Sequence, residues 1–279
     1  MMQATDSLEE LRALRAEMDG TFGLVPTMGA LHAGHESLIT RAKNECAHTG
    51  VSIFVNPTQF SPGEDLVNYP RMLQTDLKLL DQIGVDLVWI PSTESMYPNG
   101  FQTWITVDEL ASPLEGRCRP GHFKGVATVV AKLLNAFMPD KAYFGRKDAQ
   151  QIAVLRRMVR DLNFPVQLVA CPTIRDPDGL ALSSRNAYLS PSERQSASVL
   201  YRALTAAKDE YDRGERNAAV LRETMHEIIR SEPLAQAQYV SAADPDTLCE
   251  LEKVGKDVLL SLAVKLGKAR LIDNLLIEG

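Results

Sequence analysis

Two histidines, His32 and His35, stand three residues apart in the segment TMGALHAGH, directly after an apolar run. Gly29 lets the chain turn sharply there, and His35 falls near the start of the next helical pattern. The N–H groups and positive dipole end of a helix N-terminus favour a phosphate, and a histidine beside them can donate to its oxygens. The alternative is a histidine pair that caps or packs a turn. The chain's other three histidines offer no matching spacing for zinc.

The segment FGRKDAQQ places Lys147 and Asp148 just after another apolar run, with Gln151 one helical turn further on. Lysine acts as a point charge on phosphate. Aspartate can accept from sugar hydroxyls or hold the lysine. The same pattern also fits the start of a helix with an ordinary surface ion pair.

The segment RDPDGLALSSRN has a turn at Asp178–Gly179 and then Ser183, Ser184 and Arg185. Two hydroxyls and a guanidinium on a hairpin can close over a triphosphate, and the arginine can stabilise a departing pyrophosphate. Taken alone, the segment also fits a polar linker between domains.

Two further polar segments are less specific. NPTQF supplies the neutral amides of Asn56 and Gln59, which suit a hydroxylated small molecule, although Asn-Pro also starts turns. EGRCRPGHFKG gathers the basic residues Arg117, Arg119, His122 and Lys124, and it fits an anion-binding loop and a solvated basic loop equally well. Neither segment identifies a site without the others.

Composition limits the classes of protein to consider. The chain has 279 residues, 45% of them hydrophobic and 24% charged, which allows one large or two ordinary domains with a sizeable core. Its net charge of -6 argues against a nucleic-acid partner. The four dispersed cysteines form no C-x-x-C and indicate a reducing compartment. With no signal-peptide pattern and no long uncharged apolar run, we expect a cytoplasmic protein without a membrane partner.

The elements that must position these groups follow from apolar runs alternating with helical patterns. This alternation predicts an α/β fold, a Rossmann-like, mainly parallel sheet with helices on both faces. Ligands bind beyond the carboxyl ends of such strands, so PTMGALHAGH, NPTQF and FGRKD should lie on one rim. The expected strands are 22–26, 51–57, 85–91, 141–145 and 166–171, and the expected helices are 8–18, 35–46, 69–84, 125–139 and 149–163.

The pattern changes after residue 189. SPSER reads as a helix start, with Ser190 as cap and Pro191 at the first helical position. Helical patterns continue to about Arg230, and strand-like segments follow at 237–244, 257–267 and 269–278. We therefore expect an α/β domain over 1–185 and a smaller α+β C-terminal domain over 186–279.

The chain has neither a Walker A loop nor G-x-G-x-x-G. The chain resembles the pantothenate synthetase (pantoate–β-alanine ligase) family of the HIGH-motif nucleotidyltransferase superfamily. The resemblance lies in the order and spacing of the segments VPTMGALHAGH, SIFVNPTQF, YPR, YPNG, RPGHFKGV, FGRKDAQQ, DGLALSSRN and ARLIDN. The resemblance implies that HAGH is the HIGH-like motif and that LSSR corresponds to the KMSKS loop. It also implies that residues 1–185 form the nucleotide-binding and catalytic domain and that residues 186–279 form a lid. It implies a cytoplasmic homodimer that uses ATP and Mg²⁺ to condense pantoate with β-alanine, through a pantoyl-adenylate, into pantothenate, AMP and pyrophosphate.

The resemblance also implies roles for individual residues, with no residue assigned to the metal. The catalytic groups would be His35, His32, Lys147 and Arg185. ATP would be bound by Met28, Gly29, His32, His35, Gly145, Lys147, Asp148, Ile174, Leu182, Ser183, Ser184 and Arg185. The other substrates would be held by Gln59 and Gln151, with Asn56, Tyr69, Arg119 and His122 as further candidates. The chain departs from the family pattern at Arg146, Ala149 and Cys118.

Two other functions remain compatible with these residues. A nucleotidyltransferase that adenylylates a phosphate and stops there would share HAGH and the Ser-Ser-Arg segment. A non-catalytic nucleotide-binding protein would bind ATP without releasing pyrophosphate. The amides of Gln59 and Gln151 favour a neutral, hydroxyl-bearing acid as the substrate.

Overall fold

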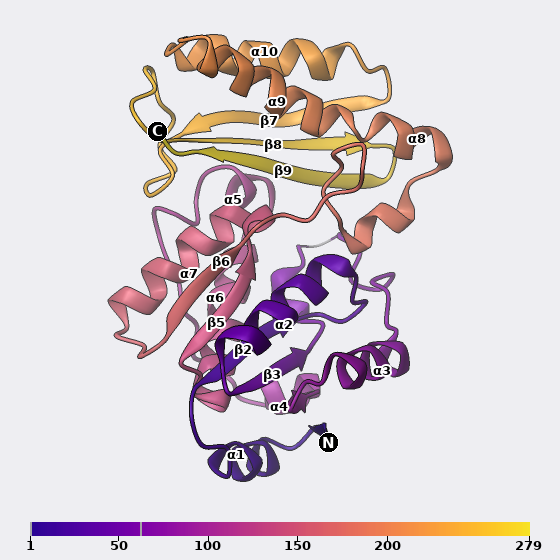
Figure 1. The fold of residues 1–279 in the computed structure, drawn as a ribbon, viewed down its shortest axis with the longest axis vertical. Coiled ribbons are helices and arrows are strands. Elements are labelled where there is room, and N and C mark those ends of the chain that lie inside the picture. The colour runs from indigo at the N-terminus through magenta and orange to yellow at the C-terminus, as the bar shows by residue number, and fades with distance from the viewer. Residues whose placement is uncertain (1, 62) are drawn as a thin grey trace. The chain divides into compact units, whose positions relative to one another are not determined.

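The computed structural model describes residues 2–61 and 63–279, which form two compact units (Figure 1). The first contains the residues up to 145 together with 150–171, and the second contains 146–149 together with 172–279. The segment 172–185 therefore packs with the second unit, whereas the sequence suggested a change of domain at 185. None of the helices in the described residues is both long and apolar enough to cross a membrane.

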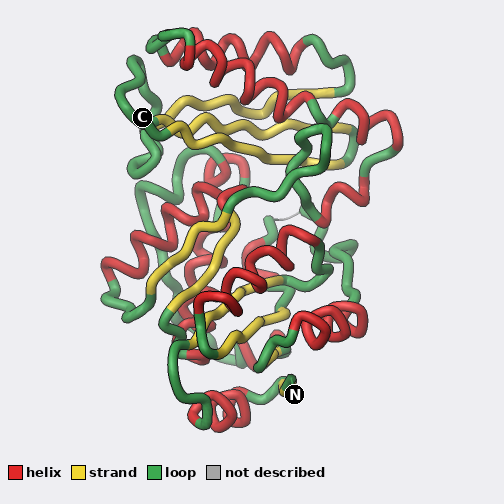
Figure 2. The backbone as a smooth tube through the Cα atoms, viewed as in Figure 1, coloured by secondary structure: helices red, strands yellow, loops and turns green. Residues whose placement is uncertain are grey.

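The first unit is built from strands and helices that largely alternate along the chain (Figure 2). A short 3₁₀ turn at Pro57–Gln59 lies in this unit, and another at Arg146–Asp148 belongs to the second unit. The elements are β1 (Gln3–Thr5), α1 (Leu8–Ala16), β2 (Phe22–Thr27), α2 (Ala33–Glu45), β3 (His48–Ile53), α3 (Leu73–Ile83), β4 (Leu87–Trp89), α4 (Thr93–Met96), α5 (Glu115–Cys118), α6 (His122–Phe137), β5 (Lys141–Gly145), α7 (Ala149–Asp161) and β6 (Gln167–Cys171).

The strands form one parallel sheet in the order β1-β4-β3-β2-β5-β6. From β2 the chain first adds strands on one side, and β5 later joins β2 on the other side. Ligands in open α/β sheets bind beside the strand ends where the order reverses in this way. In this sheet that point lies at the carboxyl ends of β2 and β5, just before the loop that carries His32 and at Gly145.

Helices cover both faces of this sheet, as the alternation predicted. Phe22 and Leu24 of β2 belong to the buried cluster that includes residues of α1, α6 and α7, whereas Val25 belongs to the cluster with residues of α2 and α3. Successive residues of a strand point to opposite faces, so a strand buried on both faces reads as a continuous apolar run. This explains why FGLVP is recognisable in the sequence.

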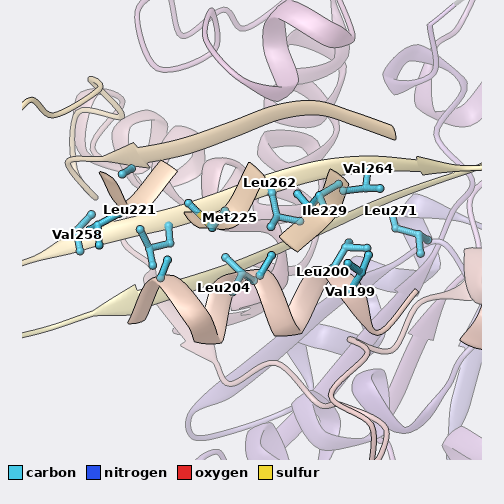
Figure 3. Close-up of a cluster of buried hydrophobic side chains, with 14 of the residues drawn as sticks. Val199, Leu200, Leu204, Leu221, Met225, Ile229, Val258, Leu262, Val264 and Leu271 are labelled. Carbon is cyan, nitrogen blue, oxygen red and sulfur yellow. The ribbon is translucent and has the colours of Figure 1, made fainter. Parts of the chain in front are cut away.

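The second unit packs two long helices on an antiparallel sheet. Ser190 and Glu193 form a reciprocal capping box at the start of its first helix, as SPSER predicted. Leu204, Met225 and Leu262 pack between the helices and the sheet (Figure 3). The elements, after a 3₁₀ turn at Ser184–Tyr188, are α8 (Pro191–Ser196), α9 (Val199–Asp212), α10 (Ala218–Arg230), β7 (Ala235–Ala243), β8 (Val258–Leu266) and β9 (Ala269–Ile277), with strand order β7-β8-β9.

The predicted α/β fold with a smaller α+β part is confirmed, with differences at the ends of elements. The helix expected over 69–84 begins at Leu73, and it ends as expected at Gly84 in the left-handed conformation. The valine-rich α6 forms despite its β-branched residues, because nearly all its side chains are buried and packing outweighs helix propensity. The three-residue β1 is too short to show a pattern in the sequence.

Candidate active site

The two histidines of TMGALHAGH form a cap at the start of α2. His32 is the N-cap residue, and its Nδ1 accepts the N–H of Gly34 at 3.1 Å. His35, three residues on, accepts the N–H of His32 through its own Nδ1 at 3.3 Å. The ring centroids lie 4.2 Å apart. This is the reciprocal arrangement of a capping box, built from imidazoles.

The cap also fixes the chemistry that the rings can offer. A neutral imidazole whose Nδ1 accepts a hydrogen bond carries its proton on Nε2. Each Nε2 is then a donor beside a helix N-terminus, where an anion is favoured. The two alternatives from the sequence, capping and phosphate binding, are therefore compatible because they use different nitrogens. Gly34 permits the geometry, since a Cβ there would come within 2.8 Å of the His32 ring.

A buried carboxylate from another helix holds the loop in front of this cap. Asp76 of α3 is 2% exposed, and its two oxygens accept the N–H groups of Ala30 and Leu31, both at 2.9 Å. Ala30 has a positive φ of 50°, a conformation that needs such support. Gly29 has a φ of 79°, and a Cβ there would lie 3.0 Å from an Asp76 oxygen. Asp76 thus sets the path of the chain into His32.

A second cluster in the first unit surrounds Gln59. The Asn56 side chain accepts the N–H of Thr58 at 3.3 Å and donates to the carbonyl of Gly125 at 3.2 Å, so the orientation of its amide is fixed. Its Nδ2 also donates to Oε1 of Gln59 at 3.1 Å. Nε2 of Gln59 then points to Sδ of Met28 at 3.1 Å. The Gln59 side chain therefore offers a donor on its Met28 side.

Arg119 and His122 hold the main chain of the same glutamine. Nδ1 of His122 donates to the Gln59 carbonyl at 2.7 Å, and Nε2 accepts from Arg119 at 3.1 Å. Arg119 also forms a two-pronged ion pair with Glu64 at 2.7 and 2.8 Å. Burial, assisted by the positive charge of Arg119, lowers the pKa of His122 to about 4. His122 is therefore neutral at neutral pH and supports the position of Gln59.

The remaining predicted residues of the first unit are placed as follows. Tyr69 is buried with its ring edge-on to Phe60, at 5.9 Å between centroids. Gly145 ends β5, and Gln151 is half-buried in the first turn of α7. The neighbouring Gln150 is buried, accepts the N–H of Glu115 and donates to two loop carbonyls, so it has a structural role.

The second unit holds the predicted cationic residues. Nζ of Lys147 donates to the carbonyl of Leu182 at 3.0 Å. Desolvation lowers the pKa of Lys147, while Asp148 and Asp273 oppose this shift and Arg185 and Arg175 add to it. Arg146, one of the departures from the family pattern, is exposed, as is Cys118 of the first unit.

The hairpin that follows β6 carries the other predicted residues of this unit. Leu182 donates its N–H to the carbonyl of Ile174 at 3.0 Å, which pairs the two arms of the hairpin. Ser183 then caps the 3₁₀ turn, its Oγ accepting the N–H of Arg185 at 3.2 Å. Ser184 and Arg185 therefore sit at the start of a turn whose geometry Ser183 sets.

Protein ligands for a metal do not gather in the described part of the chain: no group of three or more His, Cys, Asp or Glu residues there could hold a metal ion. Mg²⁺ commonly keeps several waters and binds through substrate phosphates with one or two carboxylates. A Mg²⁺ ion held mainly by the phosphates of a bound nucleotide would need few protein ligands, which fits this site. No residue is assigned to the ion.

Sequence reasoning missed several residues that position the site. The sequence does contain a signal for Asp76, because this residue falls on the apolar face of α3 with Leu73, Leu77 and Leu80. A charged residue on that face indicates a buried partner. Asp273 and Asn274 gave a similar signal, as two polar residues inside an apolar strand.

The structure first defines a class: an α/β protein with a Rossmann-like parallel sheet and a candidate anion site at a helix N-terminus. Comparison with known proteins then identifies the family. The profile of the pantoate-beta-alanine ligase family matches residues 1–276. The chain belongs to this family, which confirms the predicted family and its class, an amide-bond-forming ligase.

Individual relatives agree over the full length. The pantothenate synthetase of Roseiflexus sp. (strain RS-1) is 56% identical over 278 residues, covering 100% of both chains. The crystal structure of pantothenate synthetase from Thermus thermophilus matches with a TM-score of 0.94 and 47% identity, covering 98% of this chain and 99% of that one. The pantoate-beta-alanine ligase of Francisella tularensis, solved with β,γ-ATP and β-alanine, matches with a TM-score of 0.80 and 37% identity, covering 99% and 98%.

Proposed function

We propose that this chain condenses pantoate with β-alanine at the expense of ATP, giving pantothenate, AMP and pyrophosphate. The observation that supports the proposal is the histidine cap of α2, which follows a loop held by Asp76. Two Nε2 donors beside a helix N-terminus suit a phosphate. Family membership indicates the substrates, and the relative from Francisella tularensis was solved with β,γ-ATP and β-alanine.

The first step activates the acid. A carboxylate oxygen of pantoate attacks the α-phosphorus of ATP, the bond from that phosphorus to the bridging oxygen breaks, and pyrophosphate leaves. Charge increases on the phosphate oxygens, so donors fixed in advance lower the barrier. His35 is the proposed principal donor with His32 as its partner, and Lys147 and Arg185 are the proposed cations. Met28 and Gly29 line the same loop.

The second step forms the amide. The amine of β-alanine attacks the acyl carbon of the pantoyl-adenylate, the acyl C–O bond breaks, AMP leaves and the new amide nitrogen loses a proton. No residue needs to become a covalent nucleophile. The anhydride intermediate must be kept from water. We assign that task to the hairpin with Ser183 and Ser184, and to the second unit that carries it.

The pantoate site is proposed around Gln59. Its amide orientation, set by Asn56, presents Nε2 as a donor, which suits the oxygen acceptors of a hydroxy acid. Gln151 and Tyr69 are the further candidates. For the nucleotide, Asp148 is proposed on the ribose and the backbone of Ile174 beside the adenine. Gly145, Leu182 and Arg119 complete the predicted set.

Three finer attributes belong to the same proposal. Mg²⁺ accompanies ATP and supplies charge neutralisation on its phosphates when bound. Cytoplasmic location is supported by four cysteines that are free thiols in the structure. A homodimer is supported by the resemblance to the family, and light scattering of the purified chain tests it.

Pyrophosphate exchange tests the proposed chemistry directly. With ATP and pantoate but no β-alanine, labelled pyrophosphate should enter ATP, because the adenylate forms reversibly. Exchange that does not depend on pantoate would favour a nucleotidyltransferase with another acceptor. ATP binding without any exchange would favour a non-catalytic nucleotide-binding protein.

A further inference from the structure

Two adjacent polar residues, Asp273 and Asn274, interrupt the apolar strand β9. They come from the segment ARLIDN, to which the predicted site gives no role. Asp273 lies opposite Leu262 and Asn274 opposite Ser261 on β8. Successive residues of a strand point to opposite faces, so each can support a different part of the second unit. Asn also has a low preference for strands, which makes its presence here a cost that another benefit must offset.

Asn274 holds the main chain from which Lys147 projects. It is 8% exposed, and its Nδ2 donates to the carbonyls of Arg146 at 3.0 Å and Lys147 at 2.7 Å. These two hydrogen bonds use both protons of the amide. Because the two hydrogen bonds hold successive carbonyls, they fix the direction in which the Lys147 side chain leaves the backbone.

Asp273 holds the hairpin instead. It is 2% exposed and pairs with both terminal nitrogens of Arg175, at 2.6 and 2.9 Å. Arg175 also donates to the carbonyl of Gly179 at 3.0 Å, and its guanidinium lies 4.4 Å from the centroid of the Tyr201 ring. A backbone bridge joins Arg175 to Ala181, so this ion pair anchors the hairpin at its base.

The two supports meet at Lys147. Its ammonium donates to the carbonyl of Leu182, the residue before Ser183. The N–H of Asn274 donates to Asp273 at 2.8 Å, which links the two supports. Asp273 in turn pairs with Arg175, Arg175 donates to the Gly179 carbonyl of the hairpin, and Lys147 donates to its Leu182 carbonyl. One dipeptide of β9 thus fixes both cationic segments relative to each other.

We propose that Asn274 is a positioning residue for the ATP site, setting the place of the Lys147 ammonium through the carbonyls of Arg146 and Lys147, while Asp273 sets the hairpin that bears Arg185. This inference rests on the proposed role of Lys147 in ATP binding. A strand packed for stability alone would be served by an apolar residue at this position.

A double-mutant cycle tests it in the full-length chain, with pantoate-dependent pyrophosphate release as the readout. Asn274→Ala should lower kcat/KM for ATP on the order of tenfold or more, since small displacements of a catalytic group are costly, and should leave KM for pantoate unchanged. In a Lys147→Ala background the same substitution should cost less than about twofold, because the group it positions is gone.

Asn217→Ala is the matched control. Asn217 caps α10 in the same unit by accepting the N–H of Ala219 at 2.9 Å, so its loss destabilises that unit without touching 146–147. It should leave the ATP kinetics unchanged. If Asn274→Ala does not fold, Asn274→Leu has a side chain of similar shape, cannot donate a hydrogen bond and carries the same expectation.

The outcomes separate the inference from the function on which it rests. An equal loss from Asn274→Ala in both backgrounds, or an effect on pantoate as large as on ATP, would overturn the positioning role. Unchanged ATP kinetics in Asn274→Ala while Lys147→Ala is impaired would overturn it as well. If Lys147→Ala itself is unimpaired, the roles of both residues fall, while pyrophosphate exchange by the unmodified chain still decides the reaction.

Discussion

The residues proposed to bind ATP fall into two parts, one in each unit, and the two parts are held in different ways. In the first unit, His32 and His35 cap their own helix, so the contacts that orient them span three residues of sequence. In the second unit, Lys147 is placed by Asn274, more than a hundred residues away. The first part is therefore mainly a local structure that one distant carboxylate, Asp76, completes. The second exists only once the C-terminal sheet has formed.

The two parts also differ in the charge that they offer. The first supplies neutral imidazole and backbone donors at a helix N-terminus, and the second supplies an ammonium and a guanidinium. Neutral, rigid donors suit the stabilisation of charge that develops during reaction. Full positive charges suit the binding of a triphosphate. The difference predicts that substitutions in the two parts affect different steps.

The largest effect is expected at His35. His35→Gln keeps a side chain that can reach back to the cap but removes the imidazole donor, so adenylate formation should slow about a hundredfold while the melting temperature changes little. Single-turnover kinetics measure the rate. His226→Gln on α10 is the control and should be silent. If His35→Gln retains the full rate, the cap alone explains the histidine.

The next largest effect is expected at Asp76, which supports the loop before His32. Asp76→Asn leaves an amide that can accept only one of the two loop N–H groups, which should cost about 2 kcal/mol of unfolding free energy. The rate of adenylate formation should fall as well. Urea denaturation measures the cost, with Asp81→Asn on the exposed side of α3 as control. Equal stability of the two variants would show that Asp76 does not support the loop.

A pH-dependent effect of similar size is expected at His122. Its pKa is lowered to about 4 in the folded chain, whereas the unfolded chain has the ordinary value of 6.5. The unfolded state therefore binds more protons in this window, and stability falls as the pH falls below 6.5. The loss between pH 7 and pH 5 should be about 2 kcal/mol. His122→Gln should flatten this dependence, and an unchanged slope would contradict a buried neutral imidazole.

The smallest effect is expected at Lys147, whose loss of charge at high pH distinguishes the cationic part from the histidine part. Burial lowers the pKa of Lys147 below its ordinary 10.5, so the ammonium loses its charge at a lower pH than usual. As the pH rises past this lowered pKa, kcat/KM for ATP should decline by about tenfold per pH unit. Lys147→Arg should remove this alkaline decline, because a guanidinium stays charged. A decline at the same pH in Lys147→Arg would mean that another group titrates.

The sequence could predict what depends on local pattern. The alternating apolar runs predicted the parallel sheet and its helices, and Ser190 with Glu193 predicted the start of α8. The sequence also predicted His35 at the start of a helix, because the patterns of a strand, a turn and a helix follow one another directly there. These features arise from residues within a few positions of one another.

What the sequence could not predict depends on distant partners. The segment 172–185 belongs with the second unit because Arg175 pairs with the buried Asp273, a contact that no local pattern reveals. Asn56 was predicted as a site residue, but its part in orienting Gln59 depends on Gly125. The residue roles that came from family resemblance remain predictions for the experiments above.

The measurement that tests the central claim most directly is AMP formation by the purified chain with ATP, pantoate and β-alanine, each omitted in turn. The account predicts AMP and pantothenate in equal amounts when all three are present. It predicts AMP release near background when any one of them is left out. AMP released at the full rate without β-alanine, or no AMP with the complete mixture, would contradict the proposed function.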